Sequence, residues 1–254
     1  MENLHKPVMI NEIISFIPFE KSVNVIDATF GGGGYSKAIL EKINVNQLLA
    51  IDRDSISKIF SKEIESKFSN FTLINEKFSR IEEIVNNTKF KDKKFDIVIF
   101  DLGTSSNQID NAERGFSFNK SGPLDMQMGL SDKNAYEIIN KYEEKNLADI
   151  IYQYGEERYS RVIAREIVKN RKVKFINNTL ELSNIIKNCL PKKSKLKNKI
   201  HPATKTFQAI RIYVNDELNE LENSLKKTLN ILKKDGLILV VSFQSLEDRI
   251  VKDF

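Results

Sequence analysis

Short apolar runs alternate with helical stretches in the first hundred residues, and this alternation constrains the fold of the 254-residue chain more than any other feature. A further run of the same kind comes much later. The runs lie at 23–26, 48–51, 71–74, 95–100 and 237–242. Each is almost entirely apolar, as expected of parallel strands whose sheet is covered on both faces. The pattern therefore predicts an α/β protein with a doubly wound parallel sheet.

The stretch between the fourth and fifth runs is too long for a single crossover connection, which needs about a dozen residues. Residues 102–128 are rich in Gly, Ser, Asn and Asp and are predicted to form a loop. Four segments with helical spacing of apolar residues follow, at 135–142, 147–154, 157–170 and 180–189. A long helical pattern over 203–232 then leads to the fifth run. We therefore expect a sheet-bearing domain made of 1–104 and 203–254, with an inserted all-helical domain over 105–202.

Positive charge is concentrated in one segment of the chain. The whole chain has 40 Lys and Arg against 35 Asp and Glu, a formal charge of +5. Residues 182–215 alone hold eight Lys or Arg and no acidic residue, and subtracting these eight from +5 leaves −3 for the remainder. A local basic segment on a mildly acidic body favours a polyanionic partner, although a solvated lysine loop gives the same pattern.

Several classes of protein are disfavoured by composition. No apolar run approaches the roughly 18 residues that a membrane helix needs, and the first six residues lack the apolar core of a signal peptide. The single cysteine, Cys189, cannot form an internal disulfide. Two histidines and one cysteine cannot build a His/Cys zinc site. We expect a cytoplasmic protein with no membrane partner and no resident metal.

Acidic residues stand where three of the predicted strands end. Asp27 follows the first run and precedes four glycines at 31–34, Asp52 follows the second run, and Asp101 follows the fourth. The carboxyl ends of parallel strands meet at one edge of a sheet, where glycines let the backbone approach a ligand closely. A carboxylate after the second strand can accept both hydroxyls of a ribose, whether in NAD or in S-adenosylmethionine. The pattern predicts a nucleoside cofactor at this edge.

Glycine spacing and charge discriminate between these two cofactors. The dinucleotide fingerprint G-x-G-x-x-G is not met, because its third glycine would fall on Ser36. Three carboxylates would repel a pyrophosphate, whereas they suit a cationic cofactor that carries an amino acid. S-adenosylmethionine is therefore favoured, and an NAD-dependent oxidoreductase is kept as an alternative.

Seven motifs spread over nearly the whole chain carry a family resemblance. They are HKPV at 5–8, DLGTSSNQID at 101–110, ERGFSF at 113–118, GPLDM at 122–126, YGEER at 154–158, HPATKTFQ at 201–208 and SFQSLEDR at 242–249. Together, and in this order, they resemble the small-subunit ribosomal RNA (cytosine-N4)-methyltransferases, the MraW or RsmH family. The resemblance implies a Rossmann-like S-adenosylmethionine methyltransferase sheet with a helical insert for substrate recognition. It also implies N4-methylation of a cytidine in the decoding region of 16S rRNA.

The resemblance assigns cofactor contacts to seven positions, to which the strand-end pattern adds Asp27. The seven are Gly33, Gly34, Tyr35, Asp52, Phe78, Asp101 and Gln108. The chain departs from the family at Tyr35 and Gln244, where the family usually has His. Family members typically continue some tens of residues past Phe254, which predicts a sheet short at its C-terminal edge. These departures keep open a second alternative, a catalytically impaired RNA-binding or ribosome-assembly protein.

The chemistry of the proposed acceptor predicts the catalytic residues. The cytosine amine is a poor nucleophile because its lone pair is delocalised into the ring, so an acceptor that bonds the amine hydrogens would assist transfer. We predict that Asp101, with Ser105 and Ser106 in the following loop, supplies this acceptor. Carbon-5 methylation would need a cysteine nucleophile, and Cys189 lies in the helical insert, far from any strand end. Nitrogen is therefore the expected methyl acceptor.

Two groups of residues are predicted to contact RNA. Four lysines of the basic segment would hold phosphates, namely Lys192, Lys193, Lys195 and Lys197. Phe116, Phe118 and Met126, in the loop after the fourth strand, either clamp an unstacked base or form the core that joins the two domains. The predicted partner is 16S rRNA or the small ribosomal subunit, and the protein is expected to act as a monomer or homodimer.

Overall fold

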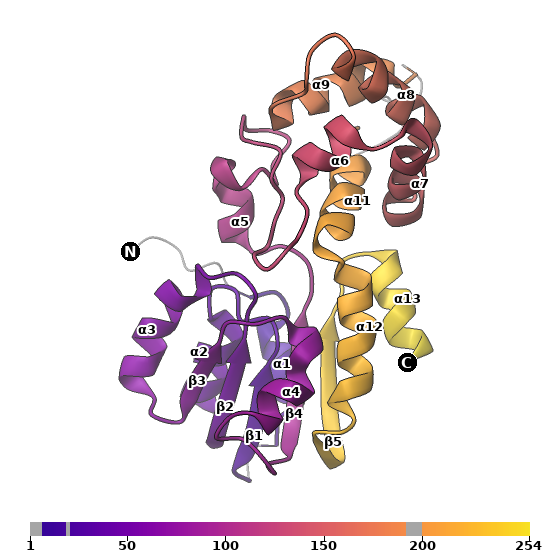
Figure 1. The fold of residues 1–254 in the computed structure, drawn as a ribbon. Helices are drawn as coiled ribbons and strands as arrows, with labels where there is room; N and C mark the ends of the chain where they lie inside the picture. The colour runs from indigo at the N-terminus through magenta and orange to yellow at the C-terminus, as the bar shows by residue number, and fades with distance from the viewer. Residues whose placement is uncertain (1–6, 19–20, 192–199) are drawn as a thin grey trace. The chain divides into compact units, whose positions relative to one another are not determined.

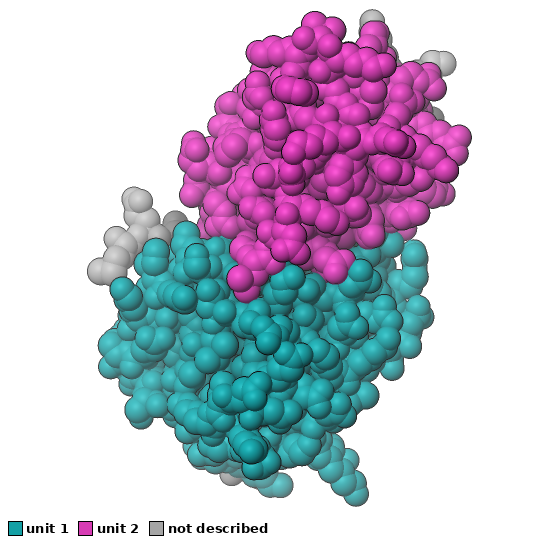
Figure 2. All heavy atoms as spheres, in the orientation of Figure 1, with its two compact units in different colours: residues 1–105, 218–254 teal, residues 106–217 magenta. Residues whose placement is uncertain are grey.

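A computed structural model describes residues 7–18, 21–191 and 200–254 of the chain (Figure 1). The chain divides into two compact units, coloured separately in Figure 2. Unit 1 consists of residues 1–105 and 218–254, and unit 2 of residues 106–217. The sheet belongs to unit 1, and unit 2 is built from helices. No helix among the residues described is both long and apolar enough to cross a membrane.

Unit 1 is built on a five-stranded parallel sheet with the strand order β3-β2-β1-β4-β5. The strands are β1 (Val23–Asp27), β2 (Val45–Ile51), β3 (Phe71–Ile74), β4 (Phe95–Asp101) and β5 (Leu232–Val241). The chain runs outward from β1 to β3 and then crosses back to β4, so the strand order reverses beside β1. Ligands of open α/β sheets bind at the carboxyl ends of the strands next to such a reversal. The sheet predicted from the five apolar runs is confirmed.

Alternate residues of the central strands supply two separate cores, one on each face of the sheet. Val25 and Ile99 pack into one core, and Ile26 and Phe100 into the other. The first face is covered by α1 (Ile10–Ser15), α2 (Gly34–Lys42) and α3 (Ser57–Lys67), and the second by α4 (Ile81–Asn86), α12 (Glu217–Thr228) and α13 (Ser245–Asp253). Because both faces are buried, the strands have no polar side, which explains why their sequences do not alternate.

Unit 2 buries its own apolar core between helices. Its elements are α5 (Ser106–Asp110), η2 (Ala112–Arg114), α6 (Ala135–Lys141), α7 (Glu144–Gly155), α8 (Ser160–Arg171), α9 (Thr179–Cys189) and α11 (Thr204–Asn215). Ile138, Leu147, Ile163 and Ile210 are fully buried members of that core and come from four of these helices. The four helical segments expected between residues 135 and 189 are present within a few residues of their predicted bounds.

The segment 203–232 forms two helices and a strand start, whereas we expected one long helix. Helix α11 ends at Asn215, and Asp216 adopts a left-handed conformation with φ 53°. The guanidinium of Arg211 donates from Nε and Nη2 to the carboxylate of Glu217, at 2.8 Å each, across this break. The interruption lets α11 remain with unit 2 while α12 covers the sheet. The unit boundary accordingly lies at 217–218, and not at 202–203.

Close packing against α7 holds α11 in unit 2. A Cβ at Gly155 would lie 2.5 Å from the carbonyl oxygen of Lys205 and 3.1 Å from Cβ of Ala209. Only glycine allows the two backbones to approach this closely. Gly155 is the last residue of α7, and its missing side chain is what lets α11 pack there.

The start of β5 also differs from expectation. The strand begins at Leu232, five residues before the predicted run at 237–242, and Asp235 within it adopts the left-handed conformation, with φ 62°. Strand pairing with β4 shifts register between Phe95 and Ile97. A Cβ at Gly236 would lie 3.0 Å from a backbone oxygen of β4, so this glycine serves a close strand approach.

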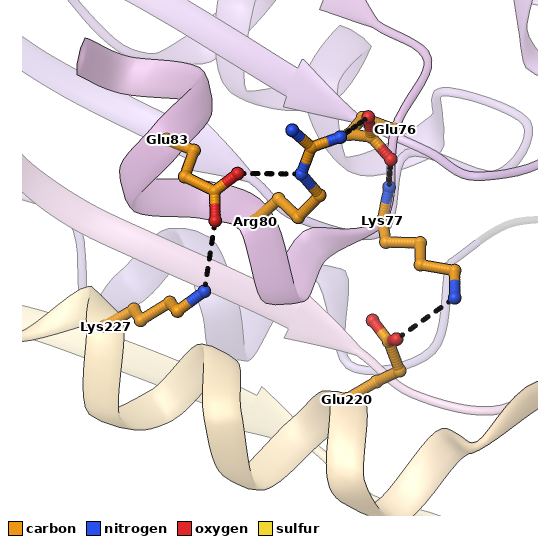
Figure 3. A network of polar contacts seen from close by, with 6 residues as sticks. All are labelled: Glu76, Lys77, Arg80, Glu83, Glu220 and Lys227. Atoms are coloured by element: carbon orange, nitrogen blue, oxygen red, sulfur yellow. Dashed lines mark hydrogen bonds and ion pairs between the residues drawn. The ribbon is translucent and has the colours of Figure 1, made fainter.

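A polar network fastens α12 to the segment that follows β3 (Figure 3). Its members are Glu76, Lys77, Arg80, Glu83, Glu220 and Lys227. Arg80 pairs with Glu83 at 2.8 Å, but both side chains are about half exposed, and such pairs contribute little. Lys77 Nζ lies 3.5 Å from Oε1 of Glu220, whose side chain is 9% exposed and whose Oε2 is buried without a hydrogen bond. Glu220 therefore depends on Lys77 for compensation of a buried charge.

Candidate functional site

The glycine turn between β1 and α2 brings backbone to the carboxyl edge of the sheet. Gly31 and Gly33 have φ values of 54° and 81°, in the left-handed region that favours glycine. A Cβ at Gly33 would lie 2.7 Å from the ring of Phe30, and one at Gly34 would lie 2.4 Å from Cγ of Pro7. No side chain fits at either position. The sharp turn into α2 therefore requires glycine, as the sequence predicted.

Asp27 and Asp52 hold this turn in place. Asp27 is fully buried and accepts hydrogen bonds from the Ser36 hydroxyl at 2.6 Å and the Thr29 N–H at 3.3 Å. Asp52 accepts from the N–H groups of Gly31 at 2.6 Å and Asp54 at 2.7 Å. Burial raises the pKa of each carboxyl to about 6. Each oxygen of Asp52 has a second lone pair, so its carboxylate can still accept a ligand hydroxyl.

Asp101, the last residue of β4, has a buried carboxylate oxygen with no hydrogen-bond partner. Its backbone N–H donates to Oγ1 of Thr29 at 2.6 Å, which fixes the strand end against the β1 turn. Burial, followed by the nearby charges of Asp27 and Glu247, raises the pKa of Asp101 to about 7. An unpaired buried acceptor is costly unless a donor reaches it. The site therefore suits a cationic group or an N–H donor supplied by a ligand.

Three further predicted residues lie around the same strand ends of unit 1. Tyr35 is 4% exposed, and its hydroxyl donates to the carbonyl oxygen of Val8. Burial is the main cause that raises the pKa of Tyr35 above its usual value, and the charge of Asp101 adds to it. Phe78 packs edge-on against Phe100 with ring centroids 5.8 Å apart. Ser105 follows β4, and its Cβ would lie 3.8 Å from a Cβ at Gly31.

The other predicted site residues belong to unit 2 or lie outside the described residues. Ser106 and Gln108 lie on α5 in unit 2, where Gln108 is buried. Lys192, Lys193, Lys195 and Lys197 lie outside the described residues. Their roles stay predictions.

The aromatic residues of the loop after β4 contribute to the core of unit 2. Phe116 and Met126 are 9% and 1% exposed and belong to that core. Phe118 stacks on the imidazole of His201, with centroids 4.6 Å apart and ring planes 9° apart, and meets Phe207 edge-on. A role in RNA binding stays a prediction for Phe116 and Phe118, and for Phe116 it requires the ring to leave this core.

The match of the whole chain to a family model decides the protein's class. The model described as the MraW methylase family matches residues 2–254. The chain belongs to this family. The ribosomal RNA small subunit methyltransferases H of Rickettsia bellii and Rickettsia canadensis are 48% and 49% identical to it. Each alignment covers 100% of this chain, and 81% and 80% of the respective relative.

A solved structure shows a weaker likeness. An rRNA methylase from Streptococcus thermophilus aligns with 41% of this chain and 58% of its own, at 19% identity and a TM-score of 0.31. The family assignment therefore depends on the family model and the relatives alone.

Family membership identifies the cofactor of this methylase as S-adenosyl-L-methionine, so the NAD alternative is wrong. When bound, this cofactor supplies a methyl group activated by a sulfonium. The residues present fit it, since Asp52 offers acceptors for ribose hydroxyls, and Asp101 offers an unpaired carboxylate oxygen near which positive charge is stabilised. Among the residues described, no cluster of three or more His, Cys, Asp or Glu is placed to hold a metal ion.

The β5–α13 turn of the methylase contains a residue that sequence reasoning missed. The N-cap of α13 is Gln244, and Glu247 stands three residues after it. Glu247 is 3% exposed and accepts from the N–H of Phe243 at 2.9 Å and from Nε2 of Gln244 at 2.7 Å. The three-residue spacing of Gln244 and Glu247 was the available sequence signal.

Asn215 is a second residue that sequence reasoning missed. It ends α11 and is 1% exposed. Its Nδ2 donates to the carbonyl oxygen of Met126 at 2.8 Å, and its Oδ1 accepts from the N–H of Met128 at 2.8 Å and the hydroxyl of Ser131 at 2.9 Å. One amide thus orders the loop that carries the GPLDM motif. No local pattern distinguishes this asparagine from an exposed one.

Proposed function

We propose that this methylase transfers a methyl group from S-adenosyl-L-methionine to N4 of a cytidine in the decoding region of 16S rRNA. The observation that carries the proposal is the buried, unpartnered Oδ1 of Asp101 at the carboxyl end of β4. The Rickettsia relatives are named as small-subunit rRNA methyltransferases and are 48% and 49% identical over the whole chain, which supports the RNA substrate.

Asp101 would act on the cytosine amine in two ways. Its carboxylate accepts an amine N–H, which localises the nitrogen lone pair and stabilises positive charge that develops as the methyl–nitrogen bond forms and the methyl–sulfur bond breaks. The amine proton then passes to the carboxylate oxygen. A pKa of about 7 for Asp101 suits this acceptor role near neutral pH. Ser105 and Ser106 are proposed to add hydrogen bonds that orient the base.

Nitrogen is a better acceptor than carbon 5 for this set of residues. Methylation at carbon 5 uses a cysteine nucleophile, and the only cysteine of the chain, Cys189, lies on α9 of unit 2. Its thiol donates to the carbonyl oxygen of Ile186 at 3.2 Å, and the side chain packs against the unit 2 core. Methyl transfer to an exocyclic amine needs no such nucleophile, only alignment of the reacting atoms.

Recognition of the RNA is proposed to involve unit 2 and the basic segment around it. Seven lysines between 187 and 205, together with Arg211, give the segment its charge. The guanidinium of Arg211 is committed to Glu217, and Lys205 Nζ donates to the carbonyl oxygen of Glu156 at 2.9 Å. The remaining lysines are the proposed phosphate contacts. We propose that the protein acts on 16S rRNA or the small subunit as a monomer or homodimer. A single cysteine, which cannot form an internal disulfide, is in keeping with a cytoplasmic protein.

Methyl incorporation tests this function directly. Purified protein is incubated with isotopically labelled S-adenosyl-L-methionine and either naked 16S rRNA or small ribosomal subunits, and the labelled RNA is digested to nucleosides. N4-methylcytidine is the expected product, and the Asp101→Ala variant should yield none. A 5-methylcytidine product would contradict the assignment of the acceptor. RNA binding with no methyl incorporation by the unaltered protein would instead support the catalytically impaired RNA-binding protein.

A further inference from the structure

An exposed aromatic ring stands beside the strand end that carries Asp101. Strands β4 and β5 pair so that Asp101 is opposite Val241, and the N–H of Leu102 donates to the carbonyl oxygen of Val241 at 3.0 Å. Phe243 comes two residues after Val241 and is 58% exposed. A Cβ at Gly103 would lie 3.7 Å from Cδ2 of Phe243, so the ring lies against the bare backbone that follows Asp101.

The backbone that carries this ring is fixed by buried hydrogen bonds. The N–H of Phe243 donates to Oε2 of Glu247 at 2.9 Å, and Nε2 of Gln244 donates to Oε1 of the same carboxylate at 2.7 Å. Glu247 itself is 3% exposed. A loose surface loop would allow a large apolar side chain to fold back onto the protein. Here the turn is held and the ring stays in solvent.

Phe243 differs from the other exposed aromatic side chains among the described residues of unit 1 in the element that it follows. Phe16 follows α1 and is 61% exposed, and Phe254 follows α13 and is 50% exposed. Neither follows a strand of the sheet. Gly103, with φ 95°, carries no side chain that could cover the Phe243 ring from the β4 side. The carboxyl edge of the sheet thus offers a flat apolar face next to a buried hydrogen-bond acceptor.

We propose that Phe243 is the platform on which the target nucleobase stacks while its amine reaches Asp101. This proposal deepens the proposed function and rests on it for the identity of the base. An unstacked base needs an aromatic face to replace its lost neighbours, together with a hydrogen-bond acceptor in its own plane for an exocyclic amine. Phe243 supplies the first, and the unpartnered Oδ1 of Asp101 supplies the second. The Glu247 carboxylate is a positioning group, because it holds the backbone of Phe243.

Because the chain contains no tryptophan, a reporter can be placed at this ring alone. The Phe243→Trp variant carries a single indole, and stacking of a base on it should quench its fluorescence saturably as 16S rRNA is added. The matched control is Phe16→Trp, which places an indole at a similarly exposed position just after α1 of the same unit. We expect saturable quenching of Phe243→Trp and a flat response of Phe16→Trp.

Activity variants give the second measurement. Stacking of a base on an aromatic ring is worth roughly 5- to 150-fold in affinity, so Phe243→Ala should lower kcat/KM for 16S rRNA by about that factor. Phe243→Tyr, which keeps the ring, should stay within a few-fold of the unaltered protein, and Phe243→Leu should not. The dissociation constant for S-adenosyl-L-methionine, measured by calorimetry, and the melting temperature should be unchanged in all three. If Phe243 had a purely structural role, its replacement would change the cofactor dissociation constant and the melting temperature.

Failure of this proposal can be told apart from failure of the proposed function. Absence of quenching in Phe243→Trp overturns the platform, whether or not the unaltered protein methylates 16S rRNA. Unchanged kcat/KM in Phe243→Ala also overturns it. Saturable quenching without methyl incorporation leaves the base platform in place and overturns only the methylation of 16S rRNA.

Discussion

Replacement of Asp101 by Asn tests the role of its carboxylate in both activity and stability. The change keeps the shape of the side chain and removes its charge and its capacity to take a proton. A general base contributes roughly 10²- to 10⁴-fold to a rate, so kcat/KM should fall by at least about 100-fold. In the unaltered protein, kcat/KM should rise with pH through about 7, because transfer needs the deprotonated carboxylate.

The same substitution should stabilise unit 1 at alkaline pH. Burial raises the pKa of Asp101 from 3.8 to about 7, so the folded state holds a proton that the unfolded state has released. The contribution of this carboxyl to stability is therefore fully present below about pH 4 and is lost as pH rises from there through 7. A shift of this size corresponds to roughly 4 kcal/mol at pH 8, at about 1.4 kcal/mol per pKa unit. Partial exposure of the carboxyl and the desolvation of the new amide reduce the expected gain to about 2 kcal/mol.

Thermal melts at pH 5, 6, 7 and 8, combined with urea titrations at each pH, measure this gain. Asp101→Asn should melt several degrees higher than the unaltered protein at pH 8, and the difference should shrink by more than half at pH 5. Asp92→Asn is the matched control, because it makes the same change at an exposed, left-handed surface position of unit 1. A destabilised Asp101→Asn at pH 8, a gain independent of pH, or kcat/KM within tenfold of the unaltered value would refute the reasoning.

Three other substitutions test separate parts of the molecule. Lys77→Met should lower the free energy of unfolding in urea by about 1–2 kcal/mol, because it leaves Glu220 buried without a counter-charge. Glu220→Gln should leave this free energy nearly unchanged, so an equal loss in the two variants would contradict the prediction. Gly155→Ala should destabilise unit 2 by about 2 kcal/mol in a thermal melt, and adding Ala209→Gly should not rescue it, because the close contact is with the backbone oxygen of Lys205. Joint neutralisation of Lys192, Lys193 and Lys195 should weaken RNA binding in filter assays and reduce the slope of log Kd against log salt by about 2–3. The affinity for S-adenosyl-L-methionine should be unchanged. If the salt dependence of RNA binding equals that of the unaltered protein, these lysines are not phosphate contacts.

Much of unit 1 could be predicted because its signals are local. Parallel strands buried on both faces are continuous apolar runs, so the five runs predicted the sheet, and the residue after each run marked its carboxyl end. Asp27, Asp52 and Asp101 were found in this way, as was the glycine turn at 31–34. The helices of unit 2 were likewise visible as apolar residues at helical spacing.

Departures from prediction arose where a distant backbone determines the conformation. The break at Asp216 divides a continuous helical pattern, because α11 packs on α7 and α12 packs on the sheet. Gly236 allows a close approach to β4 and does not end a helix. In each case the neighbour that decides the outcome is far away in sequence.

The α/β class, the helical insert, the acidic strand ends and the family resemblance all follow from the amino-acid sequence. Each of these depends on the order of residues over short distances, which periodicity, turn chemistry and motifs record. Three other features became visible only in the folded chain: Asp101 keeps an unpaired buried oxygen, Phe116 lies in a core, and Phe243 is exposed beside Gly103. Burial and hydrogen-bond partners depend on atoms that come together from separate strands and helices. A pattern along one segment of the chain therefore does not reveal them.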